Sequence, residues 1–138
     1  MAVTLNPYLS FRDDARQALE FYHSVFGGSL TISTFGDAMP GGPAAEAGKV
    51  MHGQLDGESG IVLMASDTPE AVPYQTGSDI SISLSGDDGD TLRGYWEALI
   101  DGGTVVEPLV VAPWGDHFGM CTDRFGTHWM VSIAAEAA

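Results

Sequence analysis

The hydrophobic and polar positions of this chain follow one pattern twice. In residues 5–28 and again in residues 79–103, an alternating segment is followed by a helical stripe of apolar side chains and then by a double glycine. Alternation with period two is typical of a half-buried strand, whereas apolar residues three and four apart predict an amphipathic helix. In both copies the double glycine leads into more strand-like sequence. The chain therefore predicts two related modules.

The first copy predicts a strand, a helix and three further strands. These elements fall at residues 5–11, 13–26, 30–35, 49–55 and 61–65. Asp13 or Asp14 is expected to cap the helix. Residues 36–48, rich in glycine, proline and alanine, are expected to form a long flexible loop of the kind that often covers a functional site.

The second copy predicts the same order. Its expected elements are residues 79–85, 90–99, 104–111, 117–122 and 128–133. Residues 68–77 carry two prolines and no clear period, so we expect them to connect module one (about 1–67) to module two (about 78–134). The prediction is a single domain over residues 1–138 of the α+β class, built as strand–helix–three strands, twice.

Charge narrows the range of partners. The chain has 138 residues and a formal net charge of −14, from 19 acidic and 5 basic side chains. Such a field repels nucleic acid and anionic membranes and attracts cations. It is explained either by a solvated acidic surface, which we favour, or by a preference for a cationic ligand.

The lengths of the apolar segments, the first residues and the cysteine content indicate the cellular compartment. No segment reaches the roughly 20 apolar residues that cross a bilayer, and residues 1–4 lack the features of a signal peptide. The single Cys121 excludes an intrachain disulfide, which fits a reducing compartment. We therefore expect a cytoplasmic location, and a lone cysteine on a strand is more often a buried apolar residue than a nucleophile.

Several short motifs, in order, resemble a known family. They are Pro7-Tyr8-Leu9-Ser10-Phe11, residues 18–28 with their double glycine, Val50-Met51-His52, residues 114–120, and Asp123-Arg124-Phe125-Gly126-Thr127-His128-Trp129. Together they resemble the vicinal oxygen chelate superfamily, and most of all the PhnB-like branch of the glyoxalase/bleomycin-resistance proteins. The resemblance implies two βαβββ modules, a cup-shaped mixed sheet and a homodimer. Relatives include glyoxalases, dioxygenases and metal-free bleomycin-binding proteins, so the fold does not settle the activity.

The metal-dependent members take His or Glu ligands from the first and last strands of each module. Aligned by eye, these positions fall on Asn6, Leu63, Asp79 and Met130. A leucine cannot bind a metal, and a thioether suits neither magnesium nor iron. We therefore expect no metal cofactor at the inherited site.

An alternative keeps a divalent metal ion at a rearranged site. Its ligands would be His52, Asp79, His117 and His128, all on predicted strands. This alternative predicts a glyoxalase-like lyase or dioxygenase. Against it, the histidines show no HxH or HxxxE spacing and come from separate strands.

The hypothesis we favour is metal-independent binding of a small organic molecule, cationic or aromatic in part. The expected ligand-binding residues, an apolar lining with a few polar groups, are Tyr8, His52, Leu63, Asp79, Ser81, Phe118, His128 and Met130. Asp79 would supply a fixed negative charge and Tyr8 a stacking face. Proteins of this branch are sometimes described as ubiquinone-pathway methyltransferases, but the chain has no nucleotide-cofactor fingerprint, which argues against that activity.

Overall fold

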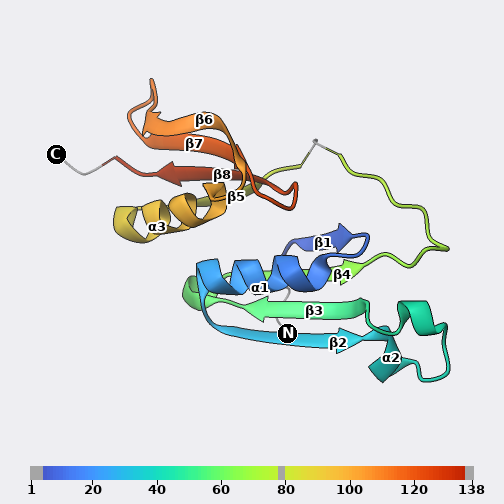
Figure 1. The fold of residues 1–138 in the computed structure, drawn as a ribbon. Helices are drawn as coiled ribbons and strands as arrows, with labels where there is room; N and C mark the ends of the chain where they lie inside the picture. Colours follow the sequence, from blue (N-terminus) through green and yellow to red (C-terminus); the bar gives the residue numbers. More distant parts are fainter. Residues whose placement is uncertain (1–4, 78–79, 136–138) are drawn as a thin grey trace. The chain divides into compact units, whose positions relative to one another are not determined.

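A computed structural model describes residues 5–77 and 80–135 of the chain. The chain divides into two compact units, and the boundary along the sequence lies between Thr76 and Gly77. Each unit contains one four-stranded sheet and one long helix (Figure 1). In the part of the chain that the structure describes, no helix is both long and apolar enough to cross a membrane.

The first unit is a βαβββ module. Its elements are β1 (Tyr8–Phe11), α1 (Ala15–Phe26), β2 (Ser29–Thr34), α2 (Phe35–Ala38), η1 (Ala44–Glu46), β3 (Val50–Asp56), η2 (Glu58–Gly60) and β4 (Val62–Asp67). The strand order is β1-β4-β3-β2. Strands β1 and β4 are parallel and the other neighbours are antiparallel, so the sheet is mixed.

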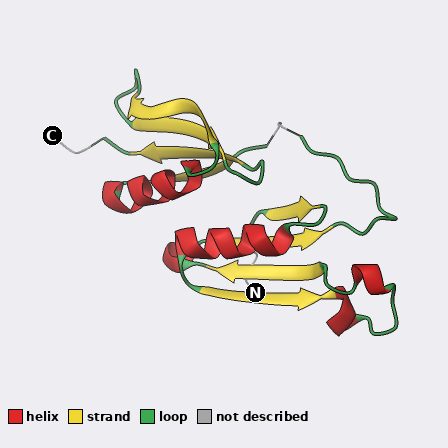
Figure 2. Ribbon diagram, in the orientation of Figure 1, coloured by secondary structure: helices red, strands yellow, loops and turns green. Residues whose placement is uncertain are grey.

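The second unit repeats this topology. Its elements are β5 (Ile82–Gly86), α3 (Gly89–Ile100), β6 (Thr104–Val111), β7 (His117–Thr122) and β8 (His128–Ile133). The order is β5-β8-β7-β6, with β5 and β8 parallel. Figure 2 shows the helices of both units in red and their strands in yellow. The α+β class and the paired βαβββ modules are thus confirmed. Each sheet is open, and the cup that the resemblance implies stays a prediction.

The apolar stripes of the two helices form the cores. The apolar stripe predicted for α1 is buried along its whole length. The stripe predicted for α3 is buried at Leu92, Trp96 and Leu99. Against α1, β3 presents Gly53, where a side chain would overlap Leu19 of the helix. The missing side chain therefore lets the helix lie close to its sheet.

The double glycines have a common structural cause. A Cβ atom on Gly28 would overlap the carbonyl oxygen of Asp56, and one on Gly103 would overlap that of Thr122. Both glycines directly precede a strand that pairs with the strand carrying that oxygen. The repeated sequence signal thus marks a close backbone approach, made once in each module.

The helix starts differ from the sequence expectation. At α1 neither predicted aspartate bonds the helix through its side chain; instead, the Asp67 carboxylate accepts hydrogen bonds from the backbone N–H groups of Ala15 and Val50, both at 2.9 Å. This group comes from the end of β4, which a local capping rule cannot detect. Helix α3 begins one residue earlier than expected, because Asp88 accepts from the Thr91 N–H at 3.1 Å.

The segment 36–48 is more regular than the loop expected from its composition. It contains most of α2 and all of η1. Its two ends are joined by a hydrogen bond from the Gly36 N–H to the Ala47 carbonyl at 2.9 Å. A run rich in glycine and proline therefore folds into short helical turns.

Candidate functional site

Each sheet has one face covered by its helix and one open face. In the first unit the covered face carries Gly53, and alternation assigns Leu55, Leu63 and Ala65 to the same face. The strand pairing places the following side chains on the opposite, open face: Tyr8, Ser10, Thr31, Ser33, His52, Gln54, Met64 and Ser66. Most of these side chains are polar and partly exposed, as expected for a surface that meets solvent or a ligand.

Two of the predicted site residues meet on this face. The Tyr8 hydroxyl and Nδ1 of His52 share a hydrogen bond of 3.2 Å. Their ring centroids lie 5.7 Å apart with the planes tilted by 35°. The Tyr8 residue is 49% exposed, so its ring is free to contact another molecule. The structure therefore forms a polar aromatic pair where the sequence placed a stacking residue and a hydrogen-bonding residue.

Leu63 is not part of this face, which corrects the sequence expectation. It is 2% exposed and pairs with Leu55 on the helix-covered side. The open-face residue of β4 is its neighbour Met64, paired with Tyr8 of β1. A shift of one residue along a strand moves a side chain to the other face of the sheet, and the alignment by eye contained that shift.

The second unit shows the equivalent register. Met130 of β8 pairs with Ser83 of β5 and Met120 of β7, just as Met64 pairs with Tyr8 and Gln54. The last-strand position for which the resemblance implied a metal ligand, Met130, and its equivalent in the first unit, Met64, are therefore both methionines. A thioether is a soft ligand and a poor partner for the oxygen-preferring divalent ions.

Other predicted residues share the open face of the second unit with Met130. Phe118 pairs with Ser132, and His128 pairs with Thr122. Nδ1 of His128 and the Thr122 hydroxyl share a hydrogen bond of 3.0 Å. Phe118 also meets the ring of Trp114, edge to face, with centroids 5.6 Å apart. This face thus combines the apolar side chains of Phe118, Met120 and Met130 with serine and threonine hydroxyls and one fixed imidazole.

His117 lies on the other side of that sheet. It pairs with Ile133, which contacts the start of α3 near Gly89, whereas His128 is five positions further along the antiparallel ladder, on the open face. The two histidines of the rearranged metal site therefore point away from each other. Among the described residues, no three His, Cys, Asp or Glu side chains are grouped as a metal site requires. The described part of the chain therefore does not bring His117 and His128 together as ligands of one ion.

The remaining predicted residues lie at the starts of the modules. Asp79 lies outside the described residues. Ser81 is exposed and immediately precedes β5. Asn6 precedes β1, and its side-chain amide donates to the carbonyl of Pro7 at 3.5 Å, a long bond to its own chain neighbour. Neither Asn6 nor Ser81 lies within a strand, so neither is held by the ladder.

Cys121 is a core residue, as the sequence favoured. It is 1% exposed, and burial together with the nearby Asp123 raises the pKa of its thiol from 9.0 to about 11. A thiol with a raised pKa forms little thiolate at neutral pH and is a weak nucleophile. The Asp123 carboxylate itself accepts hydrogen bonds from the Trp129 indole and from backbone N–H groups, so it supports the β7–β8 turn.

Two βαβββ modules with open sheet faces define the class of fold, which this chain shares with the glyoxalase/bleomycin resistance/dioxygenase superfamily. A solved member of that superfamily from Sphaerobacter thermophilus is 18% identical to this chain, covers 96% of it and 98% of its own length, and gives a TM-score of 0.58. The chain belongs to the family whose model is described as 3-demethylubiquinone-9 3-methyltransferase, which matches residues 3–132.

Two further solved structures have the same fold and are more similar to this chain. Protein PA1353 from Pseudomonas aeruginosa is 38% identical, with a TM-score of 0.86 over 98% of this chain and 100% of its own. The PhnB protein of Bacillus cereus is 22% identical, with a TM-score of 0.71 over 96% and 100%. These matches establish the family and the fold, and neither one establishes an activity.

The family description names a methyltransferase, and that activity would require a binding motif for its nucleotide cofactor in this chain. The turn between β1 and α1 is Arg12-Asp13-Asp14, and the turn between β5 and α3 contains Asp87 and Asp88. Neither turn has the glycine-rich sequence that binds a nucleotide cofactor. Nothing in the described sheets adds such a site.

Proposed function

We propose that this protein binds a small organic molecule, aromatic and positively charged in part, on the open face of its first sheet, without a metal ion. The observation that carries the proposal is the exposed ring of Tyr8, fixed by its hydrogen bond to His52. An aromatic face attracts a cation by roughly 0.5–2 kcal/mol. Met64 adds a polarizable apolar contact beside the ring.

The charge of the chain supports the choice of a cation. At −14, the protein concentrates cations near its surface and repels anions. Binding without turnover agrees with the methionines at both last-strand positions, Met64 and Met130. The open face of the second unit, with Phe118 and His128, offers a similarly lined surface.

The test uses thioflavin T, a fluorescent aromatic cation, titrated into the full-length protein. Replacing Tyr8 by Ala should weaken binding about two- to thirtyfold, whereas Tyr8→Phe, which keeps the ring, should stay within about threefold of the unaltered protein. Treatment with EDTA should not change the affinity of the unaltered protein or of the Tyr8→Phe variant for thioflavin T. Equal affinity for Tyr8→Ala and the unaltered protein would refute the role of Tyr8, and loss of binding in EDTA would restore a metal-dependent function.

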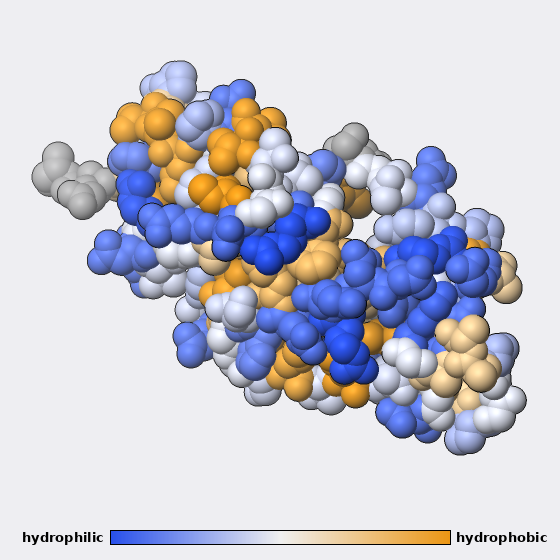
Figure 3. Space-filling model, in the orientation of Figure 1, coloured by the Kyte–Doolittle hydropathy of each residue, from blue (hydrophilic) through white to orange (hydrophobic). Residues whose placement is uncertain are grey.

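We also propose that the protein forms a homodimer through the β6 surface, defined as Val105, Val106, Val110, Val111 and Trp114. These side chains are 43–63% exposed, and apolar surface gathers over this part of the molecule (Figure 3). The equivalent edge strand of the first unit, β2, has the mostly polar sequence SLTIST. Exposed apolar surface of this extent favours a partner.

The backbone of β6 indicates how that partner would bind. Two register shifts and Pro108 interrupt the ladder along this strand, so its outer edge is poorly suited to pairing with another strand. Contact would occur through side chains. Val110→Glu should shift sedimentation from dimer to monomer, with Thr31→Glu on β2 as the matched control; a monomeric unaltered protein would refute the proposal.

A further inference from the structure

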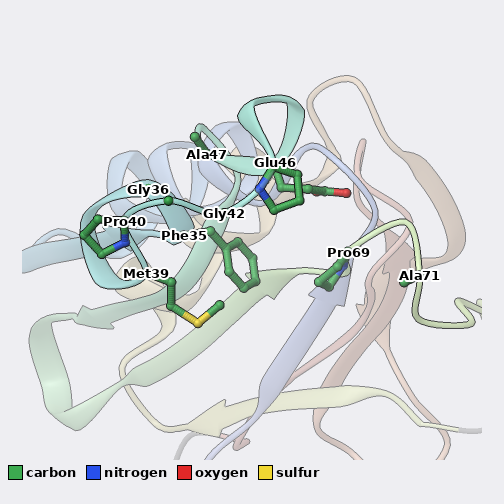
Figure 4. A pocket seen from close by; sticks show the side chains of 11 residues that line it. Phe35, Gly36, Met39, Pro40, Gly42, Glu46, Ala47, Pro69 and Ala71 are labelled. Carbon is green, nitrogen blue, oxygen red and sulfur yellow. The ribbon is translucent and has the colours of Figure 1, made fainter.

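The first unit contains an apolar cavity that is separate from the open face of its sheet. It has a volume of about 510 Å³ and is lined by α2, the following turn and the segment after β4. The main lining side chains are Phe35, Met39, Pro40, Pro43 and Pro69, with Glu46 at one side (Figure 4). This volume falls within the range of roughly 300–1,000 Å³ that is typical of small-molecule sites.

Hydrogen bonds hold both walls of the cavity in place. On the loop side, the Phe35 N–H donates to the Lys49 carbonyl at 3.0 Å and the Met39 N–H donates to the Phe35 carbonyl at 2.8 Å. On the other side, the Arg12 guanidinium donates to the Pro69 carbonyl at 2.8 Å. The cavity is therefore formed without a ligand, which reduces the entropy that a ligand would lose on binding.

Both oxygens of the carboxylate at the cavity already have partners, one of which, Lys49, also lies 3.0 Å from Asp13. Glu46 is the ionisable residue of the lining, and its carboxylate lies 2.9 Å from the Lys49 ammonium while accepting a hydrogen bond from the Glu70 N–H at 3.2 Å. The bond to Lys49 lowers the pKa of Glu46, so the ion pair persists at neutral pH. A cation would have to displace Lys49, and an anion would meet the negative field of the protein.

We infer that this cavity is a second binding site, for an uncharged aromatic or aliphatic molecule of about the size of two fused rings. Phe35 offers a ring face and the prolines offer flat apolar surfaces. Met39, 55% exposed, has a flexible thioether that adapts to the shape of a ligand. The segment 36–48, which the sequence suggested as a cover for a site, thus forms a site of its own.

The test is a fluorescence titration of the full-length protein with N-phenyl-1-naphthylamine, an uncharged probe that brightens in apolar surroundings. Phe35→Ala removes a wall, and Ala71→Trp fills the space from an exposed lining position. Both variants should weaken binding about tenfold or more. Ile80→Ala, which removes an exposed apolar side chain from the second unit, is the matched control and should bind like the unaltered protein.

Three outcomes would overturn the inference. They are unchanged affinity in both cavity variants, an equal loss in Ile80→Ala, or a change of oligomeric state in sedimentation when Ala71→Trp is introduced, which would make the cavity a contact between copies. The site is independent of the proposed cation site, because Tyr8→Ala should weaken thioflavin T and leave N-phenyl-1-naphthylamine unaffected. Thermal melts of each variant establish that a loss of binding is not a loss of folding.

Discussion

Tyr8 and His52 are hydrogen-bonded across a strand that lies between them. Tyr8 is on β1 and His52 on β3, and β4 separates these strands in the sheet. The 3.2 Å contact between the hydroxyl and Nδ1 therefore arches over the open face above β4. Neither side chain could hold this position through its own strand alone, so each residue orients the other.

The first prediction concerns this coupling. Tyr8→Phe and His52→Ala remove the same hydrogen bond, so their effects on the affinity for thioflavin T should not add. A double-mutant cycle should give a coupling energy of up to about 0.6 kcal/mol, which corresponds to the threefold change expected for Tyr8→Phe. Additive effects would mean that His52 does not position Tyr8. Ser33→Ala, on the same face beside His52, is a suitable control and should add independently.

The second prediction concerns the buried carboxylate of Asp67. It is 5% exposed and accepts hydrogen bonds from the N–H groups of Ala15 and Val50. Because an amide has only one acceptor oxygen, Asp67→Asn leaves one donor unpaired and should lower the free energy of unfolding by about 1–3 kcal/mol. Urea unfolding measures this change. The exposed Asp56→Asn should stay within about 0.5 kcal/mol of the unaltered protein.

The third prediction concerns alkaline stability. The pKa of Cys121 is raised from 9.0 to about 11 in the folded protein, so the neutral thiol is favoured by folding. The contribution of the neutral thiol to the free energy of unfolding is present below pH 9 and is lost as the pH rises towards 11. The reason is that the cysteine thiol of the unfolded chain ionises at a lower pH than that of the folded protein. Two pKa units correspond to roughly 2–3 kcal/mol.

Chemical denaturation between pH 8 and pH 11 tests the effect of Cys121. The difference in unfolding free energy between the unaltered protein and Cys121→Ala should shrink across this range, by up to the stated amount. A difference that stays constant with pH would contradict the raised pKa. Comparing the two proteins at each pH cancels the ionisation of lysines and tyrosines.

The fourth prediction concerns the double glycines. Gly103→Ala forces a methyl group against the carbonyl oxygen of Thr122 and should destabilise the protein by about 1–3 kcal/mol. Gly94→Ala, at an exposed position within α3 where a Cβ atom meets nothing, should instead stabilise the protein by about 0.5–1 kcal/mol. Thermal melts of the two variants measure both effects, and similar shifts in the two would refute the packing explanation.

The order of elements could be predicted from the sequence because it depends on local periodicity. The apolar stripes of both helices predict which of their side chains are buried, and the structure confirms this for α1 and for Leu92, Trp96 and Leu99 of α3. The alternation around Ser83 and Ser85 is seen in the pairing of β5 with β8, but Ile82 and Leu84 are only half-buried. The family resemblance also follows from short motifs in order. These signals depend only on residues that are close together in the sequence.

The residues that form the site could not be predicted in full, because their positions depend on contacts between residues far apart in the sequence. Leu63 was assigned to a ligand because a register error of one residue cannot be seen until β4 is paired with β1 and β3. His117 and His128 both lie on strands, and only the ladder shows that they face opposite ways. The cap of α1 by Asp67 joins residues 52 positions apart in the sequence.

The sequence by itself therefore determined the duplication, the class of fold and the family, because these follow from local patterns that each module repeats. The tertiary structure decided which residues share a face, that Tyr8 meets His52, and that residues 35–47 and 69–71 enclose a cavity. Strand pairing and the docking of a loop against a distant segment are long-range contacts, and their geometry is set by the packing of the whole module.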